Sequence, residues 1–440
     1  MNKWMIGIAV WAMALPVWAQ DAWDLRRCIE YAVAHNLTVK QQEEACRQNE
    51  TELSTARWSR LPNLNGSASH SFNFGRSLQA DNTYQSVNTQ NTAFNLTTSV
   101  PLFTGMQIPN NIALARLNLK AAVEDLNKAK EDISIQVTSA YLQVLFNEEL
   151  AKVAREQVTL SRDLLQQKEE FFRNGKASEA EWREAEARLA QDELSAVQAD
   201  NNVRLALLDL SQLLELPSPE GFEIVAPDTA AVSVTGRLVS PSEVFGQAVL
   251  SRPEVKAAQY RVEGALKSVR IAQSAFYPQL SLGAGLGTNY YKLFGRENIA
   301  FGSQLRDNFS QYVGFSLSIP VFNRFATRNR VRSARIQHTL LGWQLEERKK
   351  VLYKEVQQAY YNAVGAEARF ASSTKADKAA KVSFRLMEEK YRYGKATATD
   401  YNEARTNWMK AVSESIQARY DYLFRMKILD FYRGIPLELK

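Results

Sequence analysis

Four short stretches of this chain alternate between apolar and small polar residues. The alternation is clearest over residues 279–291 and 309–320, and it also runs through residues 64–76 and 89–101. Successive side chains of a β-strand point to opposite sides, so a period of two is typical of strands with one apolar face. We therefore predict four strands, arranged in two pairs.

The residues that follow each strand pair have the period of an α-helix. One apolar stripe has a mean spacing close to 3.7 residues, and it consists of Ala122, Leu126, Ala129, Ile133, Val137, Ala140 and Val144. The pattern predicts long helices over residues 105–173 and 324–392, each roughly 100 Å long at the helical rise. Shorter helices are predicted over residues 178–214 and 397–432, and over residues 38–59 ahead of the first strands.

The second half of the chain repeats the first. Matching residues lie 216 positions apart up to the strands and 219 positions apart beyond them. Pairs at the second offset include Pro101 and Pro320, Ala140 and Ala359, and Gly175 and Gly394. Two tandem copies are therefore predicted at residues 20–216 and 241–433, each with a helix, two strands, a very long helix, a turn and a helix. Residues 217–240 form an equatorial linker between them, and residues 434–440 form a C-terminal tail.

The N-terminus has the features of a secretory signal. Lys3 precedes an apolar stretch from Trp4 to Trp18, and small residues surround the predicted cut before Gln20. Residues 1–19 are predicted to be a signal peptide, without a lipid anchor because no cysteine lies near the cut. No later apolar stretch reaches about 18 residues, so any entry into a membrane is predicted to use β-strands.

The strand pattern has two interpretations. A soluble β-domain would show the same alternation. However, strands of about ten to twelve residues are long enough for a tilted membrane crossing, and aromatic residues cluster towards their ends. Four strands are too few to close a barrel, and lipid does not tolerate open sheet edges. A membrane-spanning sheet would therefore have to be shared between several chains.

Composition and motifs argue against an enzyme or a nucleic-acid-binding protein. The 54 basic and 48 acidic residues leave a modest excess that forms no single-sign tail. The three histidines lack metal-ligand spacing, and no nucleophile elbow, phosphate loop or zinc motif occurs. Gly283, Gly285 and Gly287 resemble part of a dinucleotide loop, but their alternation with apolar residues favours strand positions. We predict no catalytic residue, metal, cofactor or nucleic-acid partner.

Short motifs occur at matching places in the two copies. Val-Pro-Leu-Phe at residues 100–103 and Ile-Pro-Val-Phe at residues 319–322 end the strands, and Gly-Lys turns at residues 173–176 and 392–395 end the long helices. In this order and spacing, the chain resembles the TolC-like outer-membrane efflux family over nearly all of its mature length. The resemblance implies a mainly α fold with a membrane β-barrel portion. A homotrimer would form a twelve-stranded barrel and a periplasmic barrel of long helices.

The resemblance also implies a function and partners. Such chains are passive ducts of tripartite efflux pumps or type I secretion systems, and they export small molecules or proteins. The implied partners are outer-membrane lipid, a periplasmic adaptor (membrane fusion) protein and an inner-membrane transporter of the RND, ABC or MFS class. The implied location is the outer membrane, with a large periplasmic portion. The alternative is a secreted or periplasmic coiled-coil scaffold or adhesin, which would leave the alternating strands unexplained.

The resemblance implies a gate at the second helix tip. In the family, a tyrosine, a glycine and two acidic residues constrict the closed entrance, and here Tyr391, Gly394, Asp400 and Glu403 occupy those positions. Two carboxylates three residues apart share one helix face, and threefold assembly would place six acids around one axis. The arginine that helps to latch the closed state in the family corresponds to Ala396, which puts that latch in doubt.

The acidic residues of the tips also fit a structural role. Thr397 followed by Asp400 is a capping-box pattern, and so is Ser178 followed by Glu181. Asp400 is therefore a candidate for a gate residue, a helix cap, or both.

The two Gly-Lys turns are predicted to contact the adaptor. The residues concerned are Gly175, Lys176 and Glu181 at the first tip and Gly394 and Lys395 at the second.

Overall fold

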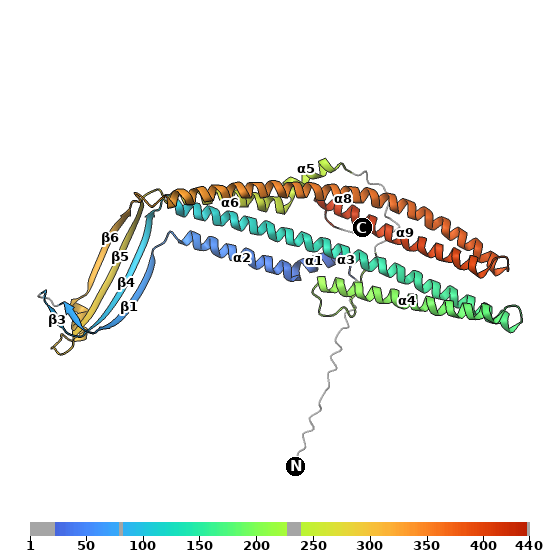
Figure 1. Ribbon diagram of the computed structural model, residues 1–440, viewed down its shortest axis with the longest axis horizontal. Helices are drawn as coiled ribbons and strands as arrows, with labels where there is room; N and C mark the ends of the chain where they lie inside the picture. The colour runs from blue at the N-terminus through green and yellow to red at the C-terminus, as the bar shows by residue number, and fades with distance from the viewer. Residues whose placement is uncertain (1–22, 79–81, 227–238, 438–440) are drawn as a thin grey trace, which may run out of the picture. The chain divides into compact units, whose positions relative to one another are not determined.

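The computed structural model describes residues 23–78, 82–226 and 239–437. The predicted signal peptide and much of the predicted linker lie outside these ranges. The chain divides into two units (Figure 1). The sheet unit comprises residues 41–128 and 249–353, and the tip unit comprises the described residues before 41, those from 129 to 248 and those from 354 onwards.

The sheet unit is built around one antiparallel sheet of four strands. Its order is β1-β4-β5-β6, so the two predicted strand pairs are joined through β4 and β5. The strands are β1 (Asn63–Asn73), β4 (Thr89–Phe103), β5 (Gln279–Leu293) and β6 (Ser310–Ser318). Two elements at the loops were not predicted: the hairpin of β2 (Arg76–Leu78) and β3 (Tyr84–Ser86), and the short helix α7 (Phe301–Asp307).

The two outer strands differ from the two inner ones. Every residue of β1 and β6 is exposed, whereas much of β4 and β5 is half-buried. The three glycines that resembled part of a dinucleotide loop all lie in β5. Gly285 pairs with Tyr312 of β6, and a Cβ atom there would lie 2.5 Å from the tyrosine ring. A larger residue here would therefore displace the exposed Tyr312 ring.

Two helices of 67 residues each follow the strand pairs. They are α3 (Gln107–Arg173) and α8 (Ala326–Arg392). Pro109 lies in the first turn of α3, where the missing N–H has no helical partner to lose. Arg324, the predicted start of the second helix, has a φ of 54° and belongs to the turn before α8. Among the helices that the structure describes, none has a stretch long and apolar enough to cross a lipid bilayer.

A break divides the helical segment ahead of each strand pair. The first copy has α1 (Leu25–His35) and α2 (Leu37–Trp58), where the sequence predicted one helix, and the second copy has α5 (Pro241–Ser251) and α6 (Pro253–Ser274). At the first break, the side-chain amide of Asn36 donates to the Leu213 carbonyl and its oxygen accepts from the Thr38 N–H. These bonds satisfy backbone groups that a helix end leaves unpaired.

Tyr141 of α3 anchors the chain segments in the middle of the tip unit. Its hydroxyl donates to the carbonyl of Val225 at 2.5 Å and approaches that of Trp23 at 3.3 Å. Trp23 forms a parallel β-bridge with Ile224 and packs edge-on against Phe222. Burial raises the pKa of Tyr141, which keeps its hydroxyl a donor. The tip unit is completed by α4 (Glu179–Leu213) and α9 (Ala398–Tyr432).

Candidate functional site at the helix tips

The first tip connects α3 to α4 through a tight, glycine-dependent turn. Gly175 has a φ of 68°, a conformation that side chains with a Cβ atom adopt at a cost. The N–H of Lys176 donates to the Phe171 carbonyl at 2.7 Å, and the N–H of Gly175 donates to the Phe172 carbonyl at 2.9 Å. These two bonds satisfy the last carbonyls of α3 and reverse the chain direction.

The second tip, between α8 and α9, has the same turn. Gly394 has a φ of 67°. The N–H of Lys395 donates to the Lys390 carbonyl at 2.8 Å, and that of Gly394 donates to the Tyr391 carbonyl at 3.0 Å. Both glycines and both lysines of the predicted adaptor site are exposed, and the two lysine side chains make no ion pair within the described part of the chain.

Both tips continue into a helix with a complete capping box. At the start of α4, the Ser178 side chain accepts from the Glu181 N–H, and the Glu181 carboxylate accepts from the Ser178 N–H. Thr397 and Asp400 make the same two bonds at the start of α9. Hydrogen bonds from Thr397 lower the pKa of Asp400. Those from the Ser178 backbone and from Lys168 lower the pKa of Glu181. Both carboxyls are therefore held in their ionised form.

An aromatic stack closes each hairpin beside its turn. Phe172 and Trp182 stack in the first hairpin, with ring centroids 5.3 Å apart. Tyr391 and Tyr401 occupy the equivalent positions 219 residues later, and their centroids are 4.8 Å apart. Tyr391, predicted as a gate residue, is thus half-buried against α9, and its position is fixed by packing.

Lys168 of α3 joins the two hairpins. Its ammonium lies 3.2 Å from a carboxylate oxygen of Glu181 and 4.6 Å from the centre of the Tyr391 ring. Burial works to lower the pKa of Lys168, but hydrogen bonds to Tyr391 and Glu181 outweigh this effect and raise it. Lys168 therefore stays charged, and it was not among the residues predicted from the sequence.

The two predicted gate acids lie near the start of α9. Asp400 and Glu403 are both exposed, and Asp400 is the cap partner of Thr397. Between them, Asn402 donates to Glu184 of α4 at 3.2 Å. The first turns of α9 thus contact the first hairpin while presenting two carboxylates to the outside.

A buried charge cluster lies further along the same helix. Arg405 is 1% exposed, and it donates to the side chain of Gln157 at 2.7 Å and to Asp192 at 2.5 Å. Ser161 also donates to Asp192. The cluster joins α3, α4 and α9. Arg188 of α4 also lies 3.6 Å from Asp192, so loss of Arg405 would leave the buried carboxylate with the more distant of these two cations.

One member of this cluster could have been recognised from the sequence. Tyr401, Arg405 and Trp408 lie at helical spacing on α9, and Tyr401 packs in the core. A charged residue on the apolar face of a helix indicates a buried partner. The partner, Asp192, lies 213 positions away, so periodicity alone does not identify it.

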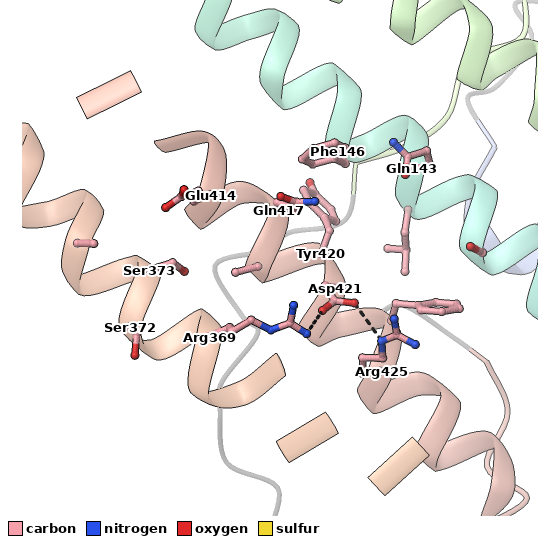
Figure 2. Close-up of a pocket in the computed structure, with 15 residues that line it drawn as sticks. Gln143, Phe146, Arg369, Ser372, Ser373, Glu414, Gln417, Tyr420, Asp421 and Arg425 are labelled. Carbon is pink, nitrogen blue, oxygen red and sulfur yellow. Dashed lines mark hydrogen bonds and ion pairs between the residues drawn. The ribbon is translucent and has the colours of Figure 1, made fainter. Parts of the chain in front are cut away.

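A pocket of about 710 Å³ lies between α3, α8 and α9 (Figure 2). Arg369 and Arg425 each donate to Asp421 at 3.0 Å, and Figure 2 shows the carboxylate between the two guanidinium groups. Because Asp421 already pairs with both cations, this part of the wall is held together by its own charges. None of these residues was predicted as a site.

These features define a class of protein with two tandem copies of a helix–strand–long-helix unit, in which the two copies share one sheet and each has a helical tip. A family model described as outer membrane efflux protein matches residues 28–215 and 244–431. The matched ranges cover most of the chain, which therefore belongs to the outer membrane efflux protein family. This is a family of outer-membrane channels, not of enzymes, and the predicted TolC-like identity is confirmed.

Individual relatives are distant in sequence. The chain is 22% identical to the alkaline protease secretion protein AprF of Pseudomonas aeruginosa over 71% of its own length and 63% of that protein. It is 21% identical to the outer membrane efflux protein BepC of Brucella suis over 89% of its length and 80% of that protein. The matched segment thus spans less than two thirds of AprF.

The solved structure of the outer-membrane channel OprN has the same fold. The two superpose with a TM-score of 0.77 at 20% identity, covering 94% of this chain and 90% of OprN. The mainly helical fold predicted from the sequence, with two tandem copies and four strands, is thereby confirmed.

Proposed function

We propose that this chain is the passive outer-membrane duct of a tripartite efflux pump or a type I secretion system, and that three copies form one pore. The observation that carries the proposal is the sheet, which has four strands and two open, fully exposed edges. Because lipid does not tolerate unpaired strand edges, a sheet in the outer membrane must be completed by further copies.

The cargo and the energy source belong to the partners in this proposal. A periplasmic adaptor protein connects the duct to an inner-membrane transporter of the RND, ABC or MFS class, and either small molecules or proteins are exported. AprF is named for protease secretion and BepC for efflux. Similar chains are therefore named both for secretion and for efflux.

Reconstitution tests the duct itself. Detergent-purified protein added to planar bilayers is expected to give discrete trimeric channel currents and to run as a trimer in unheated gels. A protein that remains monomeric without detergent and gives no current contradicts the proposal and favours a coiled-coil scaffold.

We propose further that Asp400 and Glu403 restrict the entrance of the closed channel. Asp400 is exposed and ionised, and Glu403 is exposed one turn further along α9. A ring of such carboxylates attracts cations and narrows the opening. The double variant Asp400→Ala, Glu403→Ala should increase single-channel conductance and abolish block by divalent cations. Glu186→Ala, at an exposed acid of the first hairpin that pairs with Arg183 on its own helix, serves as the control. Unchanged conductance and block would reject the gate.

Lys168 is a candidate for the cation of the closed-state latch, because Ala396 lacks a charge. Its ammonium contacts both Glu181 and Tyr391 and so ties the first tip to the second. Lys168→Met should raise the open probability in bilayers, whereas the exposed Lys176→Met should not. If both variants behave like the wild type, Lys168 has no part in closure.

The exposed turns at Gly175, Lys176, Gly394 and Lys395, with Glu181 beside the first, form the proposed adaptor contact. A lysine-reactive crosslinker should join Lys176 and Lys395 to a co-expressed adaptor. Arg variants at both positions keep the charge and remove the reactive amine, so they provide the control. Absence of a product from an active pump would exclude these turns as the contact.

A further inference from the structure

The sheet unit has two unpartnered helix faces on opposite sides. The chain enters the first edge strand, β1, from α2 and leaves the second edge strand, β6, into α8. In Figure 1, α3 lies between α2 and α8. Within this unit, α2 and α8 are therefore the outermost helices, as β1 and β6 are the outermost strands.

The outward face of α8 carries a stripe of large apolar side chains. Ile336, Leu340 and Trp343 are 60%, 45% and 72% exposed. Arg332 and Arg335 lie on the same face, and these residues line a shallow groove of about 540 Å³. Val331 and Leu352 are buried on the opposite side of the helix. An exposed apolar stripe of this size is typical of an interaction surface.

The outward face of α2 carries polar side chains, including small threonines and one acid. Gln48, Thr51, Glu52 and Thr55 line a groove there, while Leu53 is buried on the other side of the helix. Small side chains leave room for the bulky residues of α8. Within the described part of the chain, Glu52, Arg332 and Arg335 make no ion pair. The two faces therefore carry opposite charges, and the α2 groove has no large apolar lining residue to oppose the α8 stripe.

The strand directions bring these two faces together in neighbouring copies. Consecutive neighbours in the sheet are antiparallel, so β1 begins and β6 ends at the same end of the sheet. A β6 edge can then extend onto the β1 edge of a second copy in the usual antiparallel pairing. The α8 that leaves β6 would lie beside the α2 that enters β1, running in the opposite direction.

The helix ends give the register of this contact. Glu52 lies six residues before the end of α2 at Trp58, and Arg332 lies six residues after the start of α8 at Ala326. Gln48 and Ile336 each lie ten residues from the same ends. Residues at equal positions from the helix ends nearest the sheet are thus oppositely charged in one pair, and the next pair sets an amide against an apolar group.

From these observations we infer that the Arg332–Trp343 stripe of α8 docks on the Gln48–Thr55 face of α2 in the next copy of this chain, with Arg332 paired to Glu52. The inference rests on the proposed trimeric duct and assigns the helical part of its subunit contact. The interface is head-to-tail, so it repeats around a closed ring.

Site-directed crosslinking tests the register. In full-length protein with the buried Cys28 and Cys46 replaced by Ala, Gln48→Cys and Ile336→Cys are combined and treated with a short bis-maleimide in outer membranes. Crosslinked dimers and trimers are expected. Glu50→Cys with Ile336→Cys is the matched control, because residue 50 is rotated by about 200° from residue 48 on the helix.

Charge reversal tests the ion pair. Glu52→Arg and Arg332→Glu should each raise the fraction of dissociated trimer about twofold to fivefold, the range expected for an exposed pair. Combining both in one chain should restore the wild-type fraction, which loss of folding would not do. Helical content by circular dichroism is measured for every variant.

The outcomes separate this inference from the duct itself. Conducting trimers that crosslink through residue 50 but not 48, or whose double reversal is no better than the singles, overturn the assigned interface and leave the duct intact. A wild-type chain that neither trimerises nor conducts overturns both.

Discussion

The two helix tips share one local structure and differ in their tertiary contacts. Each has a left-handed glycine, a turn lysine and a capping box. At the first tip, Glu181 is also held by Lys168, whereas Asp400 at the second bonds to its own cap and, among the residues that the structure describes, to no lysine. The residues repeated in both copies thus determine the turns. The Lys168 contact at the first tip leaves the carboxylate of the second tip the more accessible one.

A second difference lies deeper in the hairpins. Arg405 of the second hairpin is buried in a cross-helix cluster, but Glu186 at the equivalent position of the first is exposed and pairs with Arg183 on its own helix. In the second copy this position therefore joins α9 to α3 and α4, whereas in the first copy it is exposed to solvent.

The largest expected effect comes from breaking the buried cluster. Arg405→Ala should lower the free energy of unfolding by about 3 kcal/mol, because buried Asp192 loses its closer cation while Arg188 remains 3.6 Å away. Glu186→Ala should change it by less than about 0.5 kcal/mol. Denaturant unfolding of the detergent-solubilised protein measures both. Equal effects at the two positions would contradict the asymmetry between the hairpins.

Replacing the turn glycine should reduce stability by a similar amount at the two tips. Gly175→Ala and Gly394→Ala force a Cβ atom into a left-handed conformation and should each cost about 1–2 kcal/mol. Gly342→Ala, inside α8 with open space around its Cβ position, should instead stabilise the protein by up to about 1 kcal/mol. Thermal unfolding compares the three. A neutral tip variant would mean that the turn can relax.

Removal of the helix caps should destabilise the two tips to different extents. Ser178→Ala and Thr397→Ala each remove a side-chain acceptor and should destabilise the following helix by about 1 kcal/mol. The loss should be smaller in α4, because Lys168 still holds Glu181 near the helix start. Hydrogen exchange of the first-turn amides reports each helix separately, and faster exchange in α4 than in α9 would reverse this order.

The smallest effect is a dependence on pH. Hydrogen bonds from Thr397 depress the pKa of Asp400 below its ordinary value of 3.8, so the cap is fully stabilising above that pH and is lost as the pH falls through the depressed value. First-turn protection of α9 should therefore stay constant from neutral pH to about 5 and fall only below 3.8. Thr397→Ala should move the Asp400 titration upward. An unchanged titration would show that the bond does not hold the carboxylate.

Patterns that involve near neighbours in the chain were readable without a structure. The long helices, the alternating strands and the glycine turns each depend on residues a few positions apart, and the Gly175 and Gly394 turns form at the sites predicted. The predicted helix over 38–59 omitted α1 because the break at Asn36 depends on its bond to Leu213. The Arg324 boundary was similarly displaced by the left-handed turn before α8.

The sequence by itself determined the duplication, the types and order of the main elements and the residues at both tips, because each is a local or periodic property of the chain. Only the tertiary structure decided which residues meet: β4 with β5 across the two copies, Lys168 with Tyr391, and Arg405 with Asp192. These contacts join residues far apart in the chain, and their partners are selected by packing geometry rather than by spacing.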